Sequence, residues 1–370
     1  MTKSNYILTL FCLLFIELVF AQQNKSTNTE PIKIGLLVTN ITAKSAQHGA
    51  EMAVFEANKT GGINRLQFQL VTRSMEGPWG TGSKQAVDLI FNEDVWALMG
   101  SHDGRNAHLV EQVIAKTHVV FLSAWASDPS LSQAFVPWYF SCVPNNIQQA
   151  RALIKNSSNK RNIDNMVVIT SDSYGSKMVL QNLLKSINSA GKTKLTFLNF
   201  DNHSEQNFNI LLDSIHKIGA KGILLMGESE MTLNFIKKLR DKNMNQYVFG
   251  TLSLLDGSES PKKESPFLNN ITLVSSKKWL GEKGKSFRIK YQKKYGKIPN
   301  ESAAYAYDGM RIIINAIKKS GPNRENLQKA MSHTNYEGLT GTFHFDNKGN
   351  RVGTIDLAVL KNGIPFLETQ

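Results

Sequence analysis

Two short apolar runs with a helical pattern between them constrain the fold of this chain more than any other stretch. Residues 95–99 and 118–122 are mostly apolar and rich in β-formers, and each run ends in a polar loop. The apolar residues between them recur at helical spacing: Leu109, Val110, Val113 and Ile114. We therefore predict a strand, a helix and a second strand. In a parallel sheet such a unit brings the loops after the two strands to one edge, where α/β proteins bind ligands.

The loops that end these strands, residues 100–105 and 123–127, carry side chains that suit a ligand. Hydroxyl groups and backbone N–H groups at the start of a helix bind carboxylates, and an exposed tryptophan offers a flat apolar surface. We interpret the two loops together as a ligand site. For single residues the alternative is capping of the following helices, by Asp103 and by Ser127 or Asp128. The candidate ligand-binding residues of the loops are Ser101, His102, Asp103, Arg105, Ser123, Trp125 and Ser127.

The same alternation of strands and helices extends over the rest of the chain. Residues 32–38 read as a buried strand and residues 46–57 as an amphipathic helix, and a second series of strands starts at Met166. A chain of 370 residues is also too long for one ordinary core. We predict an α/β protein with two doubly wound parallel-sheet lobes, joined by a three-stranded hinge, with a ligand cleft between the lobes.

The helical stretches after residue 275 have no strands between them, so we expect them to cover the sheet of the first lobe. The chain would then cross between the lobes near Asn145, Lys277 and Tyr336. Lobe 1 would comprise residues 31–144 and 277–336, and lobe 2 would comprise residues 145–276 and 337–370. The last strands, at residues 342–345, 354–360 and 364–367, are expected to complete lobe 2.

The N-terminus has the features of an export signal. Lys3 precedes a mostly apolar run over residues 6–20, and the small residue Ala21 follows it. We therefore predict a cleavable signal peptide at residues 1–21 and a periplasmic protein. A lipid anchor is not expected, because Cys12 lacks the small preceding residue of a lipobox. Removal of the signal leaves Cys142 as the single cysteine, which excludes an intrachain disulfide.

The net charge of +13 would permit binding to nucleic acid. The lysines are dispersed over predicted solvent faces, however, and no basic motif alternates with stacking aromatic residues. We interpret the charge as a solvated basic surface and predict no nucleic-acid partner. No apolar run after the signal is long enough to span a bilayer.

The order of motifs resembles the type 1 periplasmic binding proteins, specifically the Leu/Ile/Val and amide-binding branch that serves ABC transporters. The matching stretches extend over nearly the whole chain after the signal: IKIGLLV at 32–38, GAEMAVFEANKTGGIN at 49–64, VWALMGS at 95–101, VVFLSAWASDPSLS at 119–132, SDSYG at 171–175 and YEGLTGTFHFDNKGN at 336–350. This combination in this order is specific to the family.

The resemblance implies a site for an amino acid, with the carboxylate at the loop 100–105 and the ammonium at the loop 123–127. Ser127 stands where the family has a serine or threonine, and Tyr174 matches a tyrosine that closes over the ligand. The family's serine pair in the first loop is replaced by Asp103, Gly104 and Arg105, and residues 250–253 lack the acid that commonly pairs with the ammonium. These departures argue against an ordinary branched-chain amino acid.

Three further candidates lie in loops outside the central unit. Glu228 and Thr251 follow predicted strands of the second lobe, and Trp79 lies in the turn-rich loop at residues 75–82. We expect Trp79 and Trp125 to face the cleft as apolar platforms, and packing in the core is the alternative for both.

Arg105 presents a planar fork of donors that can hold a carboxylate, which points to an acid as the ligand. Its alternatives are an ion pair with Asp103 or an orientation towards solvent at the start of the helix.

We predict a solute-binding protein of an ABC importer that binds an amino acid, amide or carboxylate by closure of its lobes, as a monomer that delivers the ligand to a membrane permease. The alternative is a periplasmic ligand-sensing subunit that docks on a membrane receptor. No enzyme and no cofactor are predicted, since no G-x-S-x-G motif occurs. A metal site at His102, Asp103 and His108 is disfavoured, because His108 would lie along the helix after the loop.

Overall fold

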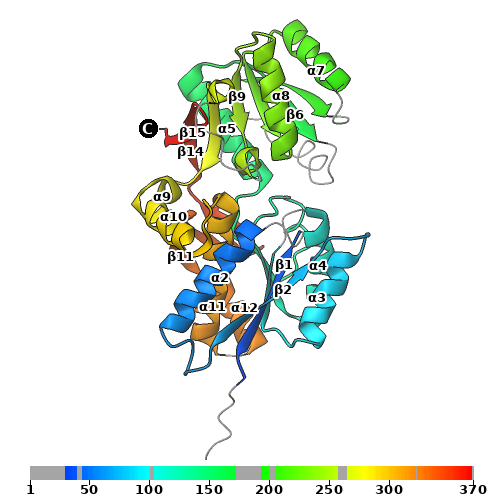
Figure 1. Ribbon diagram of the computed structural model, residues 1–370. Helices are drawn as coiled ribbons and strands as arrows, with labels where there is room; N and C mark the ends of the chain where they lie inside the picture. The colour runs from blue at the N-terminus through cyan, green and yellow to red at the C-terminus, as the bar shows by residue number, and fades with distance from the viewer. Residues whose placement is uncertain are drawn as a thin grey trace, which may run out of the picture.

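The computed structural model describes residues 30–39, 44–100, 104–171, 193–200, 205–256, 265–321 and 323–368. These residues form two α/β lobes, one stacked on the other along the long axis of the molecule (Figure 1). One lobe is built on a five-stranded sheet and the other on a seven-stranded sheet. The predicted fold of two parallel-sheet lobes is therefore confirmed.

The sheet of the first lobe has the order β2-β1-β3-β4-β5 and is parallel throughout. Its strands are β1 (Ile32–Val38), β2 (Phe68–Ser74), β3 (Ala97–Gly100), β4 (Val120–Ser123) and β5 (Tyr139–Ser141). Neighbouring residues in these strands alternate between two apolar clusters, as Leu36 and Leu37 do. The strands are therefore buried on both faces, which explains their nearly continuous apolar sequences.

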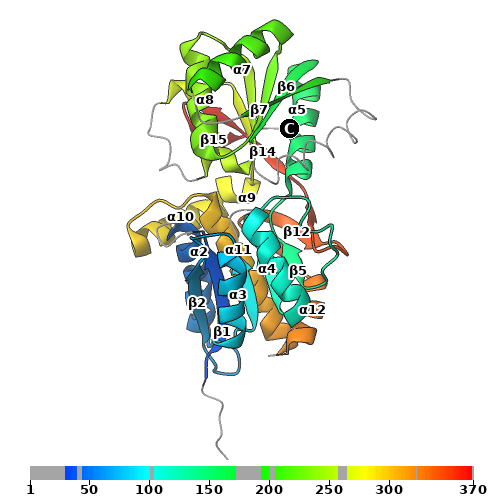
Figure 2. The same cartoon turned by 90° about the vertical axis from the view of Figure 1, so that its right-hand side faces the viewer.

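Helices cover both faces of this sheet. On one face lie α2 (Lys44–Lys59), α11 (Glu301–Ser320) and α12 (Arg324–Ser332), and on the other lie α3 (Thr81–Phe91) and α4 (Gly104–Thr117) (Figure 2). α2 and α11 pack closely, because a Cβ at Gly49 would collide with the carbonyl oxygen of Ala303. These two helices are far apart in sequence but share one layer. The chain therefore returns to the first lobe after residue 275, as expected.

The sheet of the second lobe has the order β15-β14-β10-β9-β8-β6-β7. The strands from β6 to β10 pair in parallel, and β14 and β15 extend the sheet in antiparallel pairs. The strands are β6 (Asn165–Ser171), β7 (Lys194–Phe200), β8 (Gly222–Met226), β9 (Tyr247–Gly250), β10 (Ile271–Ser275), β14 (Asp356–Lys361) and β15 (Ile364–Leu367).

The helical elements described in this lobe include α5, which the sequence pattern did not predict. They are α5 (Asn146–Arg161), α7 (Glu205–Ile218), α8 (Ser229–Asp241) and the short 3₁₀ helices η1 (Leu252–Leu255) and η2 (Pro266–Leu268). α5 begins with a capping box, in which Asn145 accepts from the N–H of Gln148 and the Gln148 side chain accepts from the N–H of Asn145. Most of its residues are polar, so its apolar stripe is weak in the sequence.

The chain leaves the first sheet after β5 and enters α5 of the second lobe. It returns after β10 through α9 (Lys277–Leu280) and α10 (Glu282–Tyr295). Among the described helices, none combines the length and the apolar character needed to cross a bilayer.

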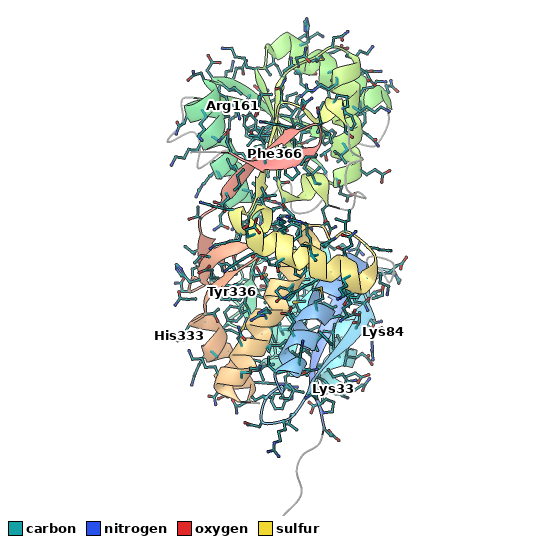
Figure 3. The ribbon with its side chains drawn as sticks, turned by 60° about the vertical axis from the view of Figure 1, so that its left-hand side comes forward. Lys33, Lys84, Arg161, His333, Tyr336 and Phe366 are labelled. Atoms are coloured by element: carbon teal, nitrogen blue, oxygen red, sulfur yellow. The ribbon has the colours of Figure 1, made fainter. Side chains whose placement is uncertain are left out.

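A small antiparallel sheet corrects one part of the expected topology. It consists of β11 (Asn335–Gly338), β12 (Gly341–Phe345) and β13 (Arg351–Gly353). We expected residues 342–345 to complete the second lobe, but Phe345 packs against Phe140 of β5, with ring centroids 5.2 Å apart. Tyr336 likewise lies with the first lobe (Figure 3). The third crossing therefore falls between β13 and β14 and not near Tyr336.

Side-chain contacts of Arg351 join two of the three crossing segments. The buried guanidinium donates from Nη1 to the carbonyl oxygen of Cys142 at 2.9 Å and lies 4.1 Å from the ring centroid of Phe343. The carbonyl oxygen of Arg351 accepts from Gln148 Nε2 at 2.9 Å. The segment after β5 and the segment at β13 are therefore held together.

Candidate ligand site between the lobes

The carboxyl ends of the parallel strands in each lobe are directed towards the other lobe. In the first lobe, Leu37 of β1, Gly100 of β3 and Ser123 of β4 are aligned across the sheet. In the second, Leu225 of β8 is aligned with Gly250 of β9. Because β5 and β10 end at these edges and the chain then passes to the opposite lobe, the two edges face each other (Figure 2). Ligand sites of open α/β sheets lie at this edge.

The start of α4 lies against the loop after β4. A Cβ at Gly104 would lie 2.7 Å from Asp128 Oδ2, so the start of α4 touches the loop after β4. Arg105 is exposed in the first turn of α4 and makes no ion pair with a described residue. Three candidates lie outside the described residues: Ser101, His102 and Asp103. The alternative ion pair between Arg105 and Asp103 is therefore not described.

His108 joins α4 to the loop after β4. Its Nδ1 lies 3.3 Å from Glu111 Oε2, and its Nε2 lies 3.6 Å from Asp128 Oδ2 and 2.9 Å from the Ser130 hydroxyl. The nearby carboxyl groups of Asp128 and Glu111 outweigh burial and raise the pKa of His108 to about 9. His108 thus lies between two buried acidic side chains, and burial raises the pKa of one of them, Glu111.

Helix capping by Asp128, one of the alternatives above, is not observed. Its Oδ1 accepts from the N–H and the hydroxyl of Ser130, at 2.9 and 2.7 Å, in a turn. Burial opposes ionisation of Asp128, but the bonds from His108 and Ser130 prevail and lower its pKa. Asp128 therefore fixes the loop that carries the candidate residues.

The predicted residues of the loop after β4 have different surroundings. Ser123 is fully buried, and its hydroxyl donates to the carbonyl oxygen of Ala126 at 3.5 Å. Ser127 is half-buried, and its hydroxyl donates to Asn146 Oδ1 at 2.8 Å. Since Asn146 is the first residue of α5, Ser127 links the ligand-facing edge of one lobe to the first crossing.

The two tryptophans differ in exposure. Trp79 is 74% exposed in the loop after β2, so core packing, its alternative, is excluded. Trp125 is 8% exposed and packs edge-on against Tyr305, with ring centroids 5.4 Å apart. Trp125 therefore belongs to the core of the first lobe, and the expectation of an open platform is corrected for this residue.

In the second lobe, the loops after β8 and β9 are joined by hydroxyl groups. Buried Thr251 shares a hydrogen bond of 2.8 Å with Ser253, whose hydroxyl donates to the carbonyl oxygen of Gly227 at 2.9 Å. Glu228 is exposed just before α8, and its carboxylate caps no backbone N–H of that helix. Tyr174 lies outside the described residues.

Two side-chain contacts between the lobes were not predicted. Asn300, before α11, donates from Nδ2 to Asp256 Oδ1 at 3.2 Å and accepts from the Ser45 hydroxyl. Ser275 at the end of β10 donates to Glu301 Oε1 at 2.6 Å. The sequence marks Asn300 as a helix cap but carries no sign of its partner in the other lobe.

A cavity of about 360 Å³ lies beside these contacts, lined in part by Leu252, Asp256, Trp279 and Glu301. Burial raises the pKa of Glu301 to about 7, although the Ser275 hydroxyl favours its ionised form. In the part of the chain that the structure describes, no three His, Cys, Asp or Glu side chains are grouped so as to hold a metal ion.

Comparisons with known proteins agree with this architecture. The branched-chain amino acid substrate-binding protein LivJ of Streptococcus pneumoniae, solved with isoleucine, is 21% identical, with a TM-score of 0.77 over 91% of this chain and 98% of that one. A solute-binding protein of Rhodopseudomonas palustris, solved with 3,4-dihydroxybenzoic acid, is 18% identical, with a TM-score of 0.77 over 91% and 96%. A substrate-binding protein of Sphaerobacter thermophilus is 17% identical, with a TM-score of 0.79 over 92% and 97%. At these identities the likeness establishes the fold.

Glutamate receptor 2.7 of Arabidopsis thaliana is 22% identical over 306 residues, which are 72% of this chain and 32% of the receptor. The chain thus spans about a third of the length of this curated relative. A family model described as periplasmic binding protein matches residues 31–363, nearly the whole described region. The chain therefore belongs to the periplasmic binding protein family.

Proposed function

We propose that the protein is an extracytoplasmic solute-binding protein of an ABC importer and that it binds a small polar ligand between its lobes. The supporting observation is that two parallel-sheet edges, each of the kind that binds ligands, face each other across three chain crossings. A ligand that contacts both edges favours the closed arrangement, because only closure provides both sets of contacts.

The ligand in this proposal carries a carboxylate. Exposed Arg105 on the first lobe offers the planar donor fork that suits this group, and exposed Glu228 on the second offers an acceptor for an ammonium. Isoleucine and 3,4-dihydroxybenzoic acid, found with two structural relatives, have the carboxyl group in common. Trp79, Ser127 and Thr251 are the further ligand-contact candidates among the described residues, and Ser101, His102, Asp103 and Tyr174 remain candidates outside them.

The membrane permease as partner, the monomeric state, the signal peptide at residues 1–21 and the periplasmic location are parts of the same proposal. Membership of the periplasmic binding protein family supports them. The second candidate is a ligand-sensing subunit that docks on a membrane receptor, and the likeness to a segment of glutamate receptor 2.7 favours it. Copurification with a permease or with a receptor distinguishes the two candidates.

A thermal-shift screen over amino acids, aromatic carboxylates, amides and alcohols tests the proposed function. We expect a carboxylate-bearing compound to raise the melting temperature, because a ligand that binds only the folded state stabilises it. Calorimetric titration then measures its affinity. If only uncharged compounds bind, the carboxylate assignment is wrong, and if no compound in any class binds, the solute-binding proposal fails.

A further inference from the structure

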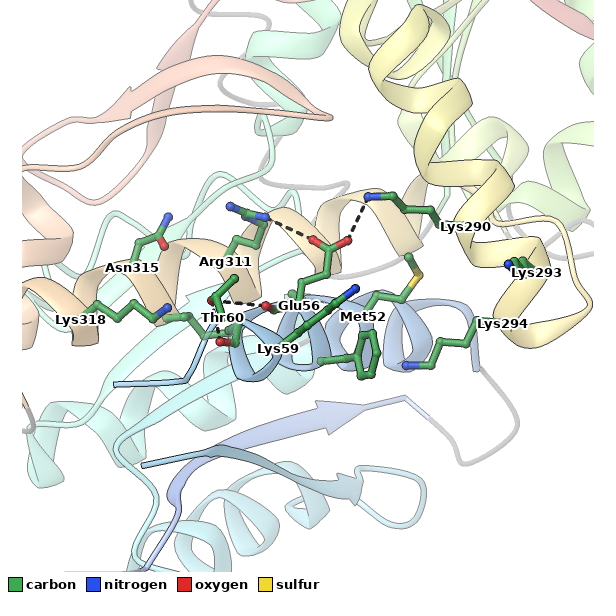
Figure 4. Close-up of a pocket in the computed structure, with 14 residues that line it drawn as sticks. Met52, Glu56, Lys59, Thr60, Lys290, Lys293, Lys294, Arg311, Asn315 and Lys318 are labelled. Carbon is green, nitrogen blue, oxygen red and sulfur yellow. Dashed lines mark hydrogen bonds and ion pairs between the residues drawn. The ribbon is translucent and has the colours of Figure 1, made fainter. Parts of the chain in front are cut away.

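A second hollow, far from the facing sheet edges, lies on the first lobe between α2, α10 and α11. Its volume is about 880 Å³. The first sheet lies on the other side of α2, so the groove opens away from that sheet (Figure 4). Six cationic side chains and one carboxylate are among its lining residues: Lys59, Lys290, Lys293, Lys294, Arg311, Lys318 and Glu56.

The single carboxylate is already engaged by its neighbours. Glu56 Oε2 accepts from the Tyr307 hydroxyl at 2.5 Å and lies 3.4 Å from Arg311 Nη1, while its Oε1 lies 3.3 Å from Lys290 Nζ. Among the described residues, no carboxylate pairs with the four remaining lysines: Lys59, Lys293, Lys294 and Lys318. The groove therefore concentrates positive charge that an anionic partner would neutralise.

The charges are spread along the groove. Lys318 lies towards one end and Lys293 and Lys294 towards the other (Figure 4). The part of α11 from Arg311 to Lys318 alone extends about 10 Å at the helical rise. One small anion cannot contact both ends, so the complementary partner is elongated and carries several negative charges.

The groove also exposes one large apolar side chain. Phe55 is 55% exposed, with Lys294 Nζ 4.4 Å from its ring centroid, whereas Met52, Ala53 and Ile314 line the groove but are at most 3% exposed. Burial of the Phe55 ring rewards an apolar group in the partner. Inorganic polyphosphate has no such group, and a flat membrane surface does not enter a concave groove.

We infer that this groove docks an acidic peptide segment of a partner protein, with Asp or Glu side chains towards both ends and an apolar side chain that packs against Phe55. Lysines suit such a segment, because their point charges accept carboxylates in many orientations. The groove shares no lining residue with the proposed solute site.

The test uses fluorescence anisotropy with a labelled Glu-Glu-Leu-Leu-Glu-Glu peptide at about 50 mM salt, where surface charge is weakly screened. The groove variant is Lys59→Gln with Lys293→Gln. The matched control is Lys237→Gln with Lys242→Gln, which removes the same charge from exposed positions at α8 of the second lobe. We expect about tenfold weaker binding for the groove variant and about twofold or less for the control.

Urea unfolding of both variants checks that they are folded, and Lys294→Gln with Lys318→Gln serves as a second groove variant. Three results would overturn the inference: no binding of the peptide to the unmodified protein, equal losses in groove and control variants, or hexaglutamate binding as tightly as the leucine-containing peptide. Stronger competition by tripolyphosphate or by anionic phosphatidylglycerol vesicles than by unlabelled peptide would also overturn it.

Discussion

Asn300 donates a hydrogen bond to Asp256 and so joins the start of α11 in one lobe to the end of η1 in the other, with Nδ2 and Oδ1 3.2 Å apart. The side-chain oxygen of Asn300, Oδ1, accepts from the N–H of Ala303 at 3.3 Å and from the Ser45 hydroxyl. One side chain thus caps a helix and bridges the lobes. These two roles can be separated by substitution.

Asn300→Ala removes both the cap and the bridge. We expect it to lower the free energy of unfolding by about 1–2 kcal/mol in urea titrations, as loss of a helix cap does. Asn300→Asp keeps an oxygen for the cap but places a second carboxylate opposite Asp256. We expect this variant to unfold close to the native midpoint and to have a larger radius of gyration without ligand. Equal stability losses in the two variants would show that capping and bridging are not separable in this way.

Asp308 anchors the turn between β11 and β12 to α11. The buried carboxylate accepts from the Tyr336 hydroxyl, from the N–H groups of Leu339 and Thr340 and from the Thr340 hydroxyl. Asp308→Ala leaves these donors buried without an acceptor and should cost roughly 3–5 kcal/mol of stability. Tyr336→Phe removes one of the bonds and should cost about 1–2 kcal/mol. Similar urea midpoints for the two variants would contradict this account.

His108 makes stability depend on pH above neutrality. Its pKa is about 9 in the folded protein, against 6.5 for an unperturbed histidine. Below pH 6.5 both the folded and the unfolded state bind the proton, and between pH 6.5 and about 9 only the folded state does, so stability falls as pH rises through this window. We expect a loss on the order of 2 kcal/mol. Urea unfolding at several pH values measures this loss in the native protein and in His108→Gln. If the free energy of unfolding falls equally with pH in both proteins, His108 is not the cause.

Arg105 tests the charge of the ligand. If its guanidinium holds a carboxylate by two parallel bonds, Arg105→Lys should weaken binding by roughly 1.5–3 kcal/mol, because a point charge does not reproduce the fork. Arg151→Lys is the matched control, since Arg151 is also exposed but lies on α5. Calorimetry with the compound from the thermal-shift screen gives both affinities. Unchanged binding by Arg105→Lys would remove Arg105 from the site.

Most strands and helices could be predicted because they have a clear apolar period, which the mostly polar α5 lacks. The buried strand predicted at residues 32–38 is β1, with the same bounds. β12 was assigned to the wrong lobe, since alternation shows that one face of a strand is buried but not which core buries it. Its Phe345 packs against Phe140 of β5 in the first lobe, and Phe343 packs against Phe345.

The site was less accessible to sequence reasoning. Loops at the carboxyl edges could be predicted because polar residues end apolar strands there, and His108 and Gly104 show that α4 touches the loop after β4. The contact between Asn300 and Asp256 joins polar residues that are distant in sequence, and no local period marks such a pair. Trp125 was misjudged, because a tryptophan after a strand can turn into the core as readily as towards a ligand.

Lobe closure on a bound ligand is the central claim, and small-angle X-ray scattering tests it most directly. A compound shown by calorimetry to bind is added at saturating concentration, and the scattering curves with and without it are compared at equal protein concentration. We predict a smaller radius of gyration with ligand and an unchanged molecular mass. Superimposable curves for the free and the fully bound protein would contradict closure of the two lobes.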